Sequence, residues 1–307
     1  MRLINVNTLL ISEFLNDHHL PRYAILSHTW SSDEVTFQEM QKPRAVRNKL
    51  GRLKIKAACC VARRDGLEWL WADTCCIDKA SSAELSEAIN SMFRYYQQST
   101  MCYAYLDDVS LEGRRELADP VEGLGQSRWF TRGWTLQELL APSELQFLDH
   151  NWDYMGTRSS LSQTLSQVTR IPEEVLDGSR SIFEFNVYER LRWAAGRETT
   201  RIEDMAYCLI GLFDVNMPLL YGEGLKAFAR LQLEIIQRNY DSSVFMHVLH
   251  DCHPPPSSAQ SVVEVQPVST KSSTQGSTEI LDEKYGLDKT TASKHWFPRR
   301  RGKVHNT

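Results

Sequence analysis

The chain has 307 residues, which is enough for about two domains and a substantial core. Its 42% hydrophobic and 24% charged residues exclude a wholly disordered chain, a collagen-like repeat and a multi-span membrane protein. The formal net charge of −4 leaves no global positive excess to attract nucleic acid. Because the sequence has neither an 18-residue apolar run nor a signal peptide, we expect no membrane span and a cytoplasmic location. Seven cysteines without a CxxC spacing predict reduced, mostly buried thiols and no metal site.

Short apolar runs alternate with helical patterns in the first half of the chain. The runs that predict strands are 23–27, 67–72, 101–106 and 145–148. Helical spacing of apolar residues predicts helices at 43–65, after the capping box Ser81-x-x-Glu84, and at about 128–141. Strands that alternate with helices are typical of an α/β fold, in which a parallel sheet is covered by helices on both faces.

Helical patterns dominate the second half, and the composition changes near residue 250. Helices are predicted at about 158–169, 172–178, 184–196, 201–213 and 224–239, with a second capping box at Thr200-x-x-Glu203. Arg201, Glu203 and Asp204 are interpreted as a structural charge cluster at a helix start. We therefore expect an α/β domain at 1–150, a helical extension packed on it at 151–245, and a mostly disordered Ser/Pro-rich tail with a basic end at 246–307.

Polar residues follow three of the predicted strands. The first strand ends in Ser27-His28-Thr29-Trp30, the second runs into Asp73 and Asp78, and the third ends in Asp107-Asp108. Ligands of open parallel sheets bind outside the carboxyl ends of the strands, so these side chains are predicted to meet at one edge.

The segment Ser127-Arg-Trp-Phe-Thr-Arg-Gly-Trp-Thr-Leu-Gln-Glu-Leu139 is unusually rich in tryptophan and charge. Trp134 and Glu138 are four residues apart and share a helix face. A carboxyl beside aromatic surface loses solvation, which raises its pKa. Such a pair suits a site that stacks a planar ring and stabilises developing positive charge. The alternative is a structural ion pair of Glu138 with Arg128 or Arg132, with the tryptophans in the core.

Three blocks resemble the signature blocks of the fungal heterokaryon-incompatibility (HET) domain, in the order of that family. They are Tyr23-Ala-Ile-Leu-Ser-His-Thr-Trp30, Trp69-Leu-Trp-Ala-Asp-Thr-Cys-Cys-Ile-Asp78 and Arg132-Gly-Trp-Thr-Leu-Gln-Glu-Leu139. The resemblance covers about residues 1–245 and implies a fungal protein that acts in non-self recognition as a cell-death effector.

A more distant resemblance concerns Toll/interleukin-receptor (TIR) domains. The Trp134-Thr-Leu-Gln-Glu-Leu139 segment is similar to the pattern that carries the catalytic glutamate of NAD-cleaving TIR domains, with Thr135 where that pattern has cysteine. This resemblance implies a flavodoxin-like parallel sheet, a catalytic Glu138, self-association and partner signalling proteins. NAD would then be a substrate, and no bound cofactor is expected.

These observations define the candidate site and its alternatives. Glu138 is the candidate catalytic residue, and the candidate ligand-binding residues are Ser27, His28, Trp30, Asp73, Arg132 and Trp134. One alternative is a non-catalytic signalling or oligomerisation module that triggers cell death through partners. Another is a thiol hydrolase in which His28 activates Cys75 or Cys76, both of which follow a strand end.

Overall fold

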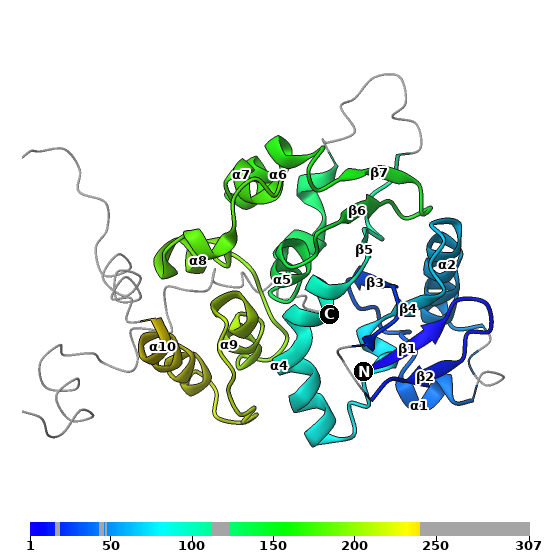
Figure 1. The fold of residues 1–307 in the computed structure, drawn as a ribbon, viewed down its shortest axis with the longest axis horizontal. Coiled ribbons are helices and arrows are strands. Elements are labelled where there is room, and N and C mark those ends of the chain that lie inside the picture. The colour runs from blue at the N-terminus through cyan, green and yellow to red at the C-terminus, as the bar shows by residue number, and fades with distance from the viewer. Residues whose placement is uncertain (16–18, 43–45, 47, 112–122, 240–307) are drawn as a thin grey trace, which may run out of the picture.

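The computed structural model describes residues 1–15, 19–42, 46, 48–111 and 123–239, and its centre is a seven-stranded mixed sheet (Figure 1). The strands are β1 (Arg2–Asn5), β2 (Ile11–Glu13), β3 (Tyr23–His28), β4 (Trp69–Trp71), β5 (Met101–Tyr105), β6 (Leu145–Leu148) and β7 (Tyr154–Thr157). They lie in the order β2-β1-β4-β3-β5-β6-β7. The four central strands are parallel, and β1, β2 and β7 pair antiparallel at the edges.

The predicted α/β class is confirmed, and all four predicted strands are present. The predicted parallel strands form the centre of the sheet, and the antiparallel strands β1, β2 and β7, which were not predicted, extend it at both edges. These three strands have three or four residues each and are only partly buried, so their apolar runs are too short to stand out in the sequence.

The order of the parallel strands determines where a ligand crevice forms. In chain order the parallel strands are β3, β4, β5 and β6, and in space β4 precedes β3, so their arrangement is 2-1-3-4. This is the beginning of the doubly wound, flavodoxin-like order. The chain therefore changes direction between β3 and β5, and a crevice is expected outside their carboxyl ends.

Helices cover both faces of the sheet. The helices of the first half are α1 (Phe37–Met40), α2 (Leu50–Arg64), α3 (Asp73–Cys76), α4 (Ser82–Gln98) and α5 (Thr135–Leu140). Helix α2 packs against β4 on one face, and α4 and α5 lie together on the other (Figure 1). Each buries an apolar stripe against the strands, as the helical spacing predicts.

The two predicted capping boxes have different outcomes. The Ser81 hydroxyl caps α4 by accepting from the backbone N of Glu84 at 3.3 Å, but the Glu84 carboxylate accepts from the backbone N of Asp78 at 2.7 Å. The box at Thr200 is wrong, because the helix begins later, with Glu203 at its N-cap.

The second half is helical and lies beside α4 and α5, away from the edge strands β1 and β2 (Figure 1). Its elements are α6 (Ser162–Thr169), α7 (Glu173–Leu176), the 3-10 turn η4 (Ile182–Glu184), α8 (Val187–Trp193), α9 (Asp204–Tyr207), the 3-10 turn η5 (Ile210–Phe213) and α10 (Lys226–Asn239). The predicted helix 201–213 is therefore two short elements. The division at residue 150 stays a prediction, and the predicted tail 246–307 lies outside the described residues. No helix in the described part of the chain has the length and apolar character to cross a bilayer.

Gly211 permits the close approach of η5 to α4. A Cβ at this position would overlap the side chain of Phe93 on α4. We expect Gly211→Ala to lower the free energy of unfolding by about 2 kcal/mol, as for other overpacked cores. Urea unfolding measures the loss. Gln97→Ala is the control, because Gln97 is an exposed residue of α4, and an equal loss in both variants would contradict this account.

Candidate functional site

A cavity of about 330 Å³ lies at the carboxyl edge of the parallel strands, on the side of α4 and α5. Six of the seven predicted site residues line it: His28, Trp30, Asp73, Arg132, Trp134 and Glu138. The seventh, Ser27, is fully buried behind it and contacts Glu138. The helical second half also contributes to the lining, through Thr200, Arg201, Asp204 and Tyr221. The structure thus brings all the predicted residues to one place.

A chain of hydrogen bonds holds the Glu138 carboxyl. The Ser27 hydroxyl donates to Oε2 of Glu138 at 2.5 Å, and Nε1 of Trp129 donates to the Ser27 oxygen at 2.8 Å. Because the indole N–H occupies a lone pair of that oxygen, the hydroxyl proton is directed at Glu138. Trp129 is fully buried, so the carboxyl is fixed to the core of the domain.

The helix that carries Glu138 is shorter than predicted. The segment 128–141 forms the 3-10 turn η3 (Arg128–Thr131) and then α5, with a break at Arg132-Gly133-Trp134. In the break, the backbone N of Gly133 donates to the carbonyl of Glu198 at 2.8 Å. A Cβ at Gly133 would lie 2.5 Å from Cγ2 of Thr199, so only glycine permits this approach. This hydrogen bond therefore attaches the helical second half to the segment that precedes the Glu138 helix.

The Glu138 carboxyl has a strongly altered acidity. Burial raises its pKa to about 8, and the neighbouring charge of Asp73 adds to the rise. Hydrogen bonds from Ser27 and Tyr96 and the charge of Arg132 act in the opposite direction. A carboxyl that titrates near neutral pH can hold or accept a proton during a reaction.

The alternative ion pair of Glu138 is not found among the described residues. Arg128 pairs instead with Asp107 across the carboxyl ends of the sheet, and Arg132 donates from Nη2 to the Thr200 hydroxyl at 3.2 Å. The same alternative placed the tryptophans in the core. This is correct for Trp129, whereas Trp134 lines the cavity.

Lys79 is a cavity residue that the sequence analysis missed. Its Nζ lies 3.4 Å from the centre of the Trp30 ring and 3.6 Å from Oδ2 of Asp73. Burial lowers the pKa of Lys79, and the charge of Asp73 opposes this. One face of Trp30 is therefore occupied by a cation, and a ligand ring would need its other face. Its position in the sequence could have indicated this role, because Lys79 follows Asp73 and Asp78 in the segment after strand β4.

His28 lines the cavity, but its ring is turned into the protein. Its side chain is 1% exposed, and Nε2 lies 3.6 Å from Oε2 of Glu34. Burial acts to raise the pKa of Glu34, but hydrogen bonds and charge from His28 and Lys54 outweigh it and hold that pKa well below its usual range. This environment is that of a buried histidine beside an ionised carboxylate.

The thiol-hydrolase alternative has little geometric support. Cys75 and Cys76 are buried, and no described contact joins either thiol to His28. The hydrogen bond with Cys76, together with burial, holds the pKa of Cys75 well above its usual range, which opposes thiolate formation. Among the described residues, no group of His, Cys, Asp and Glu could hold a metal ion.

Residues interpreted from sequence as a charge cluster form part of the cavity wall. Asp204 accepts a hydrogen bond from the Tyr221 hydroxyl at 2.9 Å. Burial raises the pKa of Asp204, and interactions with Tyr221 and Trp134 oppose the rise. The guanidinium of Arg201 lies 4.5 Å from the centre of the Tyr221 ring. Glu203 has the structural role expected for it, since its carboxylate accepts from the backbone N of Gly222.

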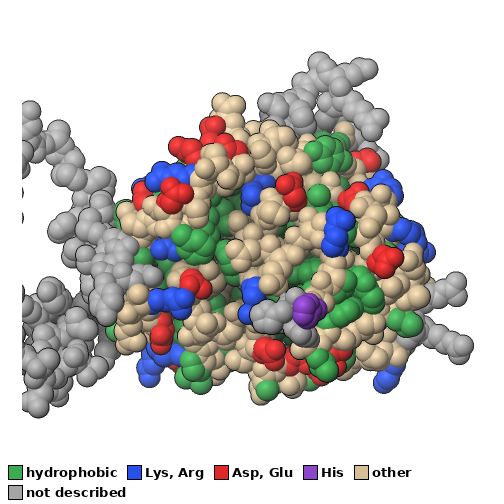
Figure 2. All heavy atoms as spheres, in the orientation of Figure 1, with side chains coloured by type: hydrophobic (Ala, Val, Ile, Leu, Met, Phe, Trp, Pro, Cys, Tyr) green, Lys and Arg blue, Asp and Glu red, His purple; other side chains and the backbone are tan. Residues whose placement is uncertain are grey.

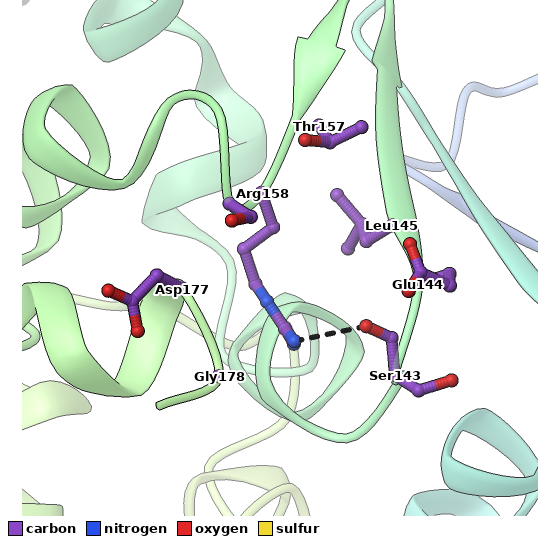
Figure 3. A pocket seen from close by; sticks show the side chains of 8 residues that line it. Ser143, Glu144, Leu145, Thr157, Arg158, Asp177 and Gly178 are labelled. Carbon is purple, nitrogen blue, oxygen red and sulfur yellow. Dashed lines mark hydrogen bonds between the residues drawn. The ribbon is translucent and has the colours of Figure 1, made fainter. Parts of the chain in front are cut away.

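A second cavity, of about 430 Å³, is lined by the loop that follows α5, by the neighbouring ends of β6 and β7 and by the end of α7 (Figure 3). Its central cation, Arg158, donates to the carbonyl oxygens of Leu139 and Pro142 at 2.8 Å and also to that of Ser143. Because these carbonyls end α5, the guanidinium stabilises the helix that carries Glu138. We assign this cavity a structural role.

The fold and the site define an α/β protein with an aromatic cavity that holds cationic side chains and the buried Glu138 carboxyl. Residues 23–123 match the family described as Heterokaryon incompatibility protein (HET). The chain is 49% identical over 221 residues to the Vegetative incompatibility protein HET-E-1 of Podospora anserina, across 70% of this chain and 16% of that relative. Residues 23–123 are therefore identified as a HET domain, as the sequence blocks at 23–30 and 69–78 predict. No solved structure matches it, and the similarity to TIR domains stays a prediction.

The raised pKa of Glu138 predicts a pH-dependent effect on stability. Between pH 4.5 and about 8 the folded protein keeps a proton that the unfolded chain releases, so the free energy of unfolding falls as the pH rises through this window. Glu138→Gln removes this penalty. We expect it to stabilise the protein by about 2 kcal/mol at pH 8, about half of the full linkage value because the side chain is partly exposed, and by much less at pH 5.

Urea unfolding at the two pH values measures this difference. Glu173→Gln is the matched control, because Glu173 is an exposed carboxylate in the first turn of α7. An equal effect of Glu138→Gln at pH 5 and pH 8 would contradict the raised pKa.

Proposed function

We propose that this protein is a heterokaryon-incompatibility effector that causes cell death by cleaving NAD between nicotinamide and ribose, with Glu138 as the catalytic residue. The observation that carries the proposal is the Glu138 carboxyl, held by Ser27 at the switch point of the sheet and open to a cavity with aromatic walls. The family membership supports the biological role. The relative is named a vegetative incompatibility protein, and this chain spans 16% of its length.

The proposed reaction is hydrolysis of one glycosidic bond. The bond from the ribose carbon to the pyridinium nitrogen breaks, and its electron pair stays on nicotinamide, which leaves as a neutral molecule. The oxygen of a water molecule bonds to the same ribose carbon, and its proton passes to the Glu138 carboxylate. The products are nicotinamide and ADP-ribose, and the proton is later released to solvent.

One carboxylate is sufficient for this chemistry. An ordinary glycoside needs a second carboxyl as an acid for its leaving group, whereas a pyridinium leaves without protonation. The ionised Glu138 stabilises the positive charge that develops on the ribose ring. Its pKa of about 8 also makes it a suitable proton acceptor near neutral pH. The bound cationic pyridinium favours the ionised carboxylate by direct attraction.

The first test of the proposal is nicotinamide release. We expect the full chain to release nicotinamide from NAD and Glu138→Gln to reduce the rate by about 100-fold or more, the usual effect of losing such a group. Glu173→Gln should retain the rate. Expression in a fungal host should reproduce the contrast, with cell death from the parent chain and survival with Glu138→Gln.

Two results would overturn the enzymatic proposal. One is the absence of nicotinamide release by the assembled protein, and the other is release that survives Glu138→Gln. Full toxicity of Glu138→Gln would favour the non-catalytic signalling module.

The hydrogen bond from Ser27 predicts a shift of the pH profile. This bond stabilises the ionised carboxylate, so Ser27→Ala raises the pKa of Glu138 further. The pH at which kcat/KM reaches half of its plateau should therefore rise above that of the parent chain, which we expect near 8. Ser91→Ala is the control, because it removes a buried hydroxyl of α4 that does not line the cavity. A midpoint that stays in place or falls in Ser27→Ala would count against the role of this bond.

A further inference from the structure

Five residues form one wall of the cavity, which we call the extension wall: Arg132, Trp134, Arg201, Asp204 and Tyr221. Three of them come from the helical second half. The Asp204 carboxylate accepts from the Tyr221 hydroxyl at 2.9 Å, which holds the Tyr221 ring in place, and Trp134 interacts with the same carboxylate. A preorganised aromatic surface of this kind binds a planar ring without an ordering cost.

The extension wall brings two arginines together. Nη2 of Arg132 donates to the hydroxyl of Thr200, which immediately precedes Arg201 in the chain. Both guanidiniums line the same cavity. Arg132 is half-buried and Arg201 is exposed, so the pair extends from the cavity to its mouth.

The nearby carboxylates do not form ion pairs with these arginines. Glu203 accepts from the backbone N of Gly222 at 2.8 Å and of Gly224 at 3.1 Å, and Asp204 accepts from the Tyr221 hydroxyl. Within the described residues, neither Arg132 nor Arg201 forms a salt bridge. Lys79, the third cation of the cavity, forms an ion pair with Asp73, whereas Arg201 contacts the face of the Tyr221 ring and keeps its charge unpaired among the residues described.

We propose that the extension wall is the recognition surface for a nucleoside diphosphate, in which Arg132 and Arg201 hold the diphosphate and Trp134 and Tyr221 hold the base. Guanidinium groups bind phosphate oxygens through paired, charge-assisted hydrogen bonds. Acidic and basic side chains are interspersed over the face in Figure 2, so the attraction for an anion comes from this local pair. NAD contains such a diphosphate, so this assignment deepens the proposed function. The identity of NAD as the natural ligand rests on the proposed function.

Equilibrium binding of ADP and of adenosine to the full chain tests this assignment. Arg201→Gln should weaken the binding of ADP by about tenfold or more and leave that of adenosine unchanged, because only ADP carries the phosphates. The matched control is Arg192→Gln, since Arg192 is an exposed arginine 5.8 Å from the ring of Tyr188 and does not line the cavity. It should leave both affinities unchanged.

Tyr221→Leu provides the complementary variant. Loss of the ring should weaken the binding of ADP and of adenosine by the same factor of about ten, because both ligands carry the base. The pattern of the two variants therefore separates a phosphate contact from a general disturbance of the wall.

Three outcomes would overturn the inference: no binding of ADP to the parent chain, no effect of Arg201→Gln on ADP, or an equal loss for ADP and adenosine in Arg201→Gln. The proposed function fails by a different observation, the absence of nicotinamide release. Binding of ADP that depends on Arg201, in a chain that releases no nicotinamide, would uphold the recognition surface and overturn the enzymatic proposal.

Discussion

The hydrogen bond from Ser27 to Glu138 is the interaction on which the site depends. It joins the carboxyl end of the buried strand β3 to the six-residue helix α5, and the indole N–H of Trp129 holds the Ser27 hydroxyl in place. The carboxyl therefore has little freedom to turn away from the cavity. The same confinement removes the carboxyl from water and raises its pKa. Glu138 therefore lowers the stability of the folded protein at neutral pH. Such a cost is typical of a functional residue.

The second physical constraint is the attachment of the helical half beside this helix. The backbone of Gly133 pairs with that of Glu198, and Gly211 lets its own turn, η5, approach α4. Arg158 holds the carbonyls at the other end of α5. The helix that carries Glu138 is thus fixed at both ends, and the cavity gains a wall from residues that lie more than 60 positions further along the chain.

The sequence predicted the central sheet and most of the site because each depends on local patterns. Buried strands such as 23–28 are continuous apolar runs, and the carboxyl ends of parallel strands meet at one edge, which placed Trp30 and Asp73 near Glu138. The antiparallel edges were missed because short, half-buried strands carry little pattern. The roles of Lys79 and of Arg201 were missed because they depend on tertiary contacts. A glycine that breaks a helix so that another segment can dock is equally invisible to helical periodicity.

The central claim is that Glu138 is a confined carboxyl that changes its protonation near neutral pH. Carbon-13 NMR of the glutamate side-chain carboxyls, titrated from pH 4 to pH 10, tests it directly, and the signal absent from Glu138→Gln identifies the residue. The account predicts a midpoint at about 8 for that signal. A midpoint near 4.5, the ordinary value of a solvated glutamate, would contradict it.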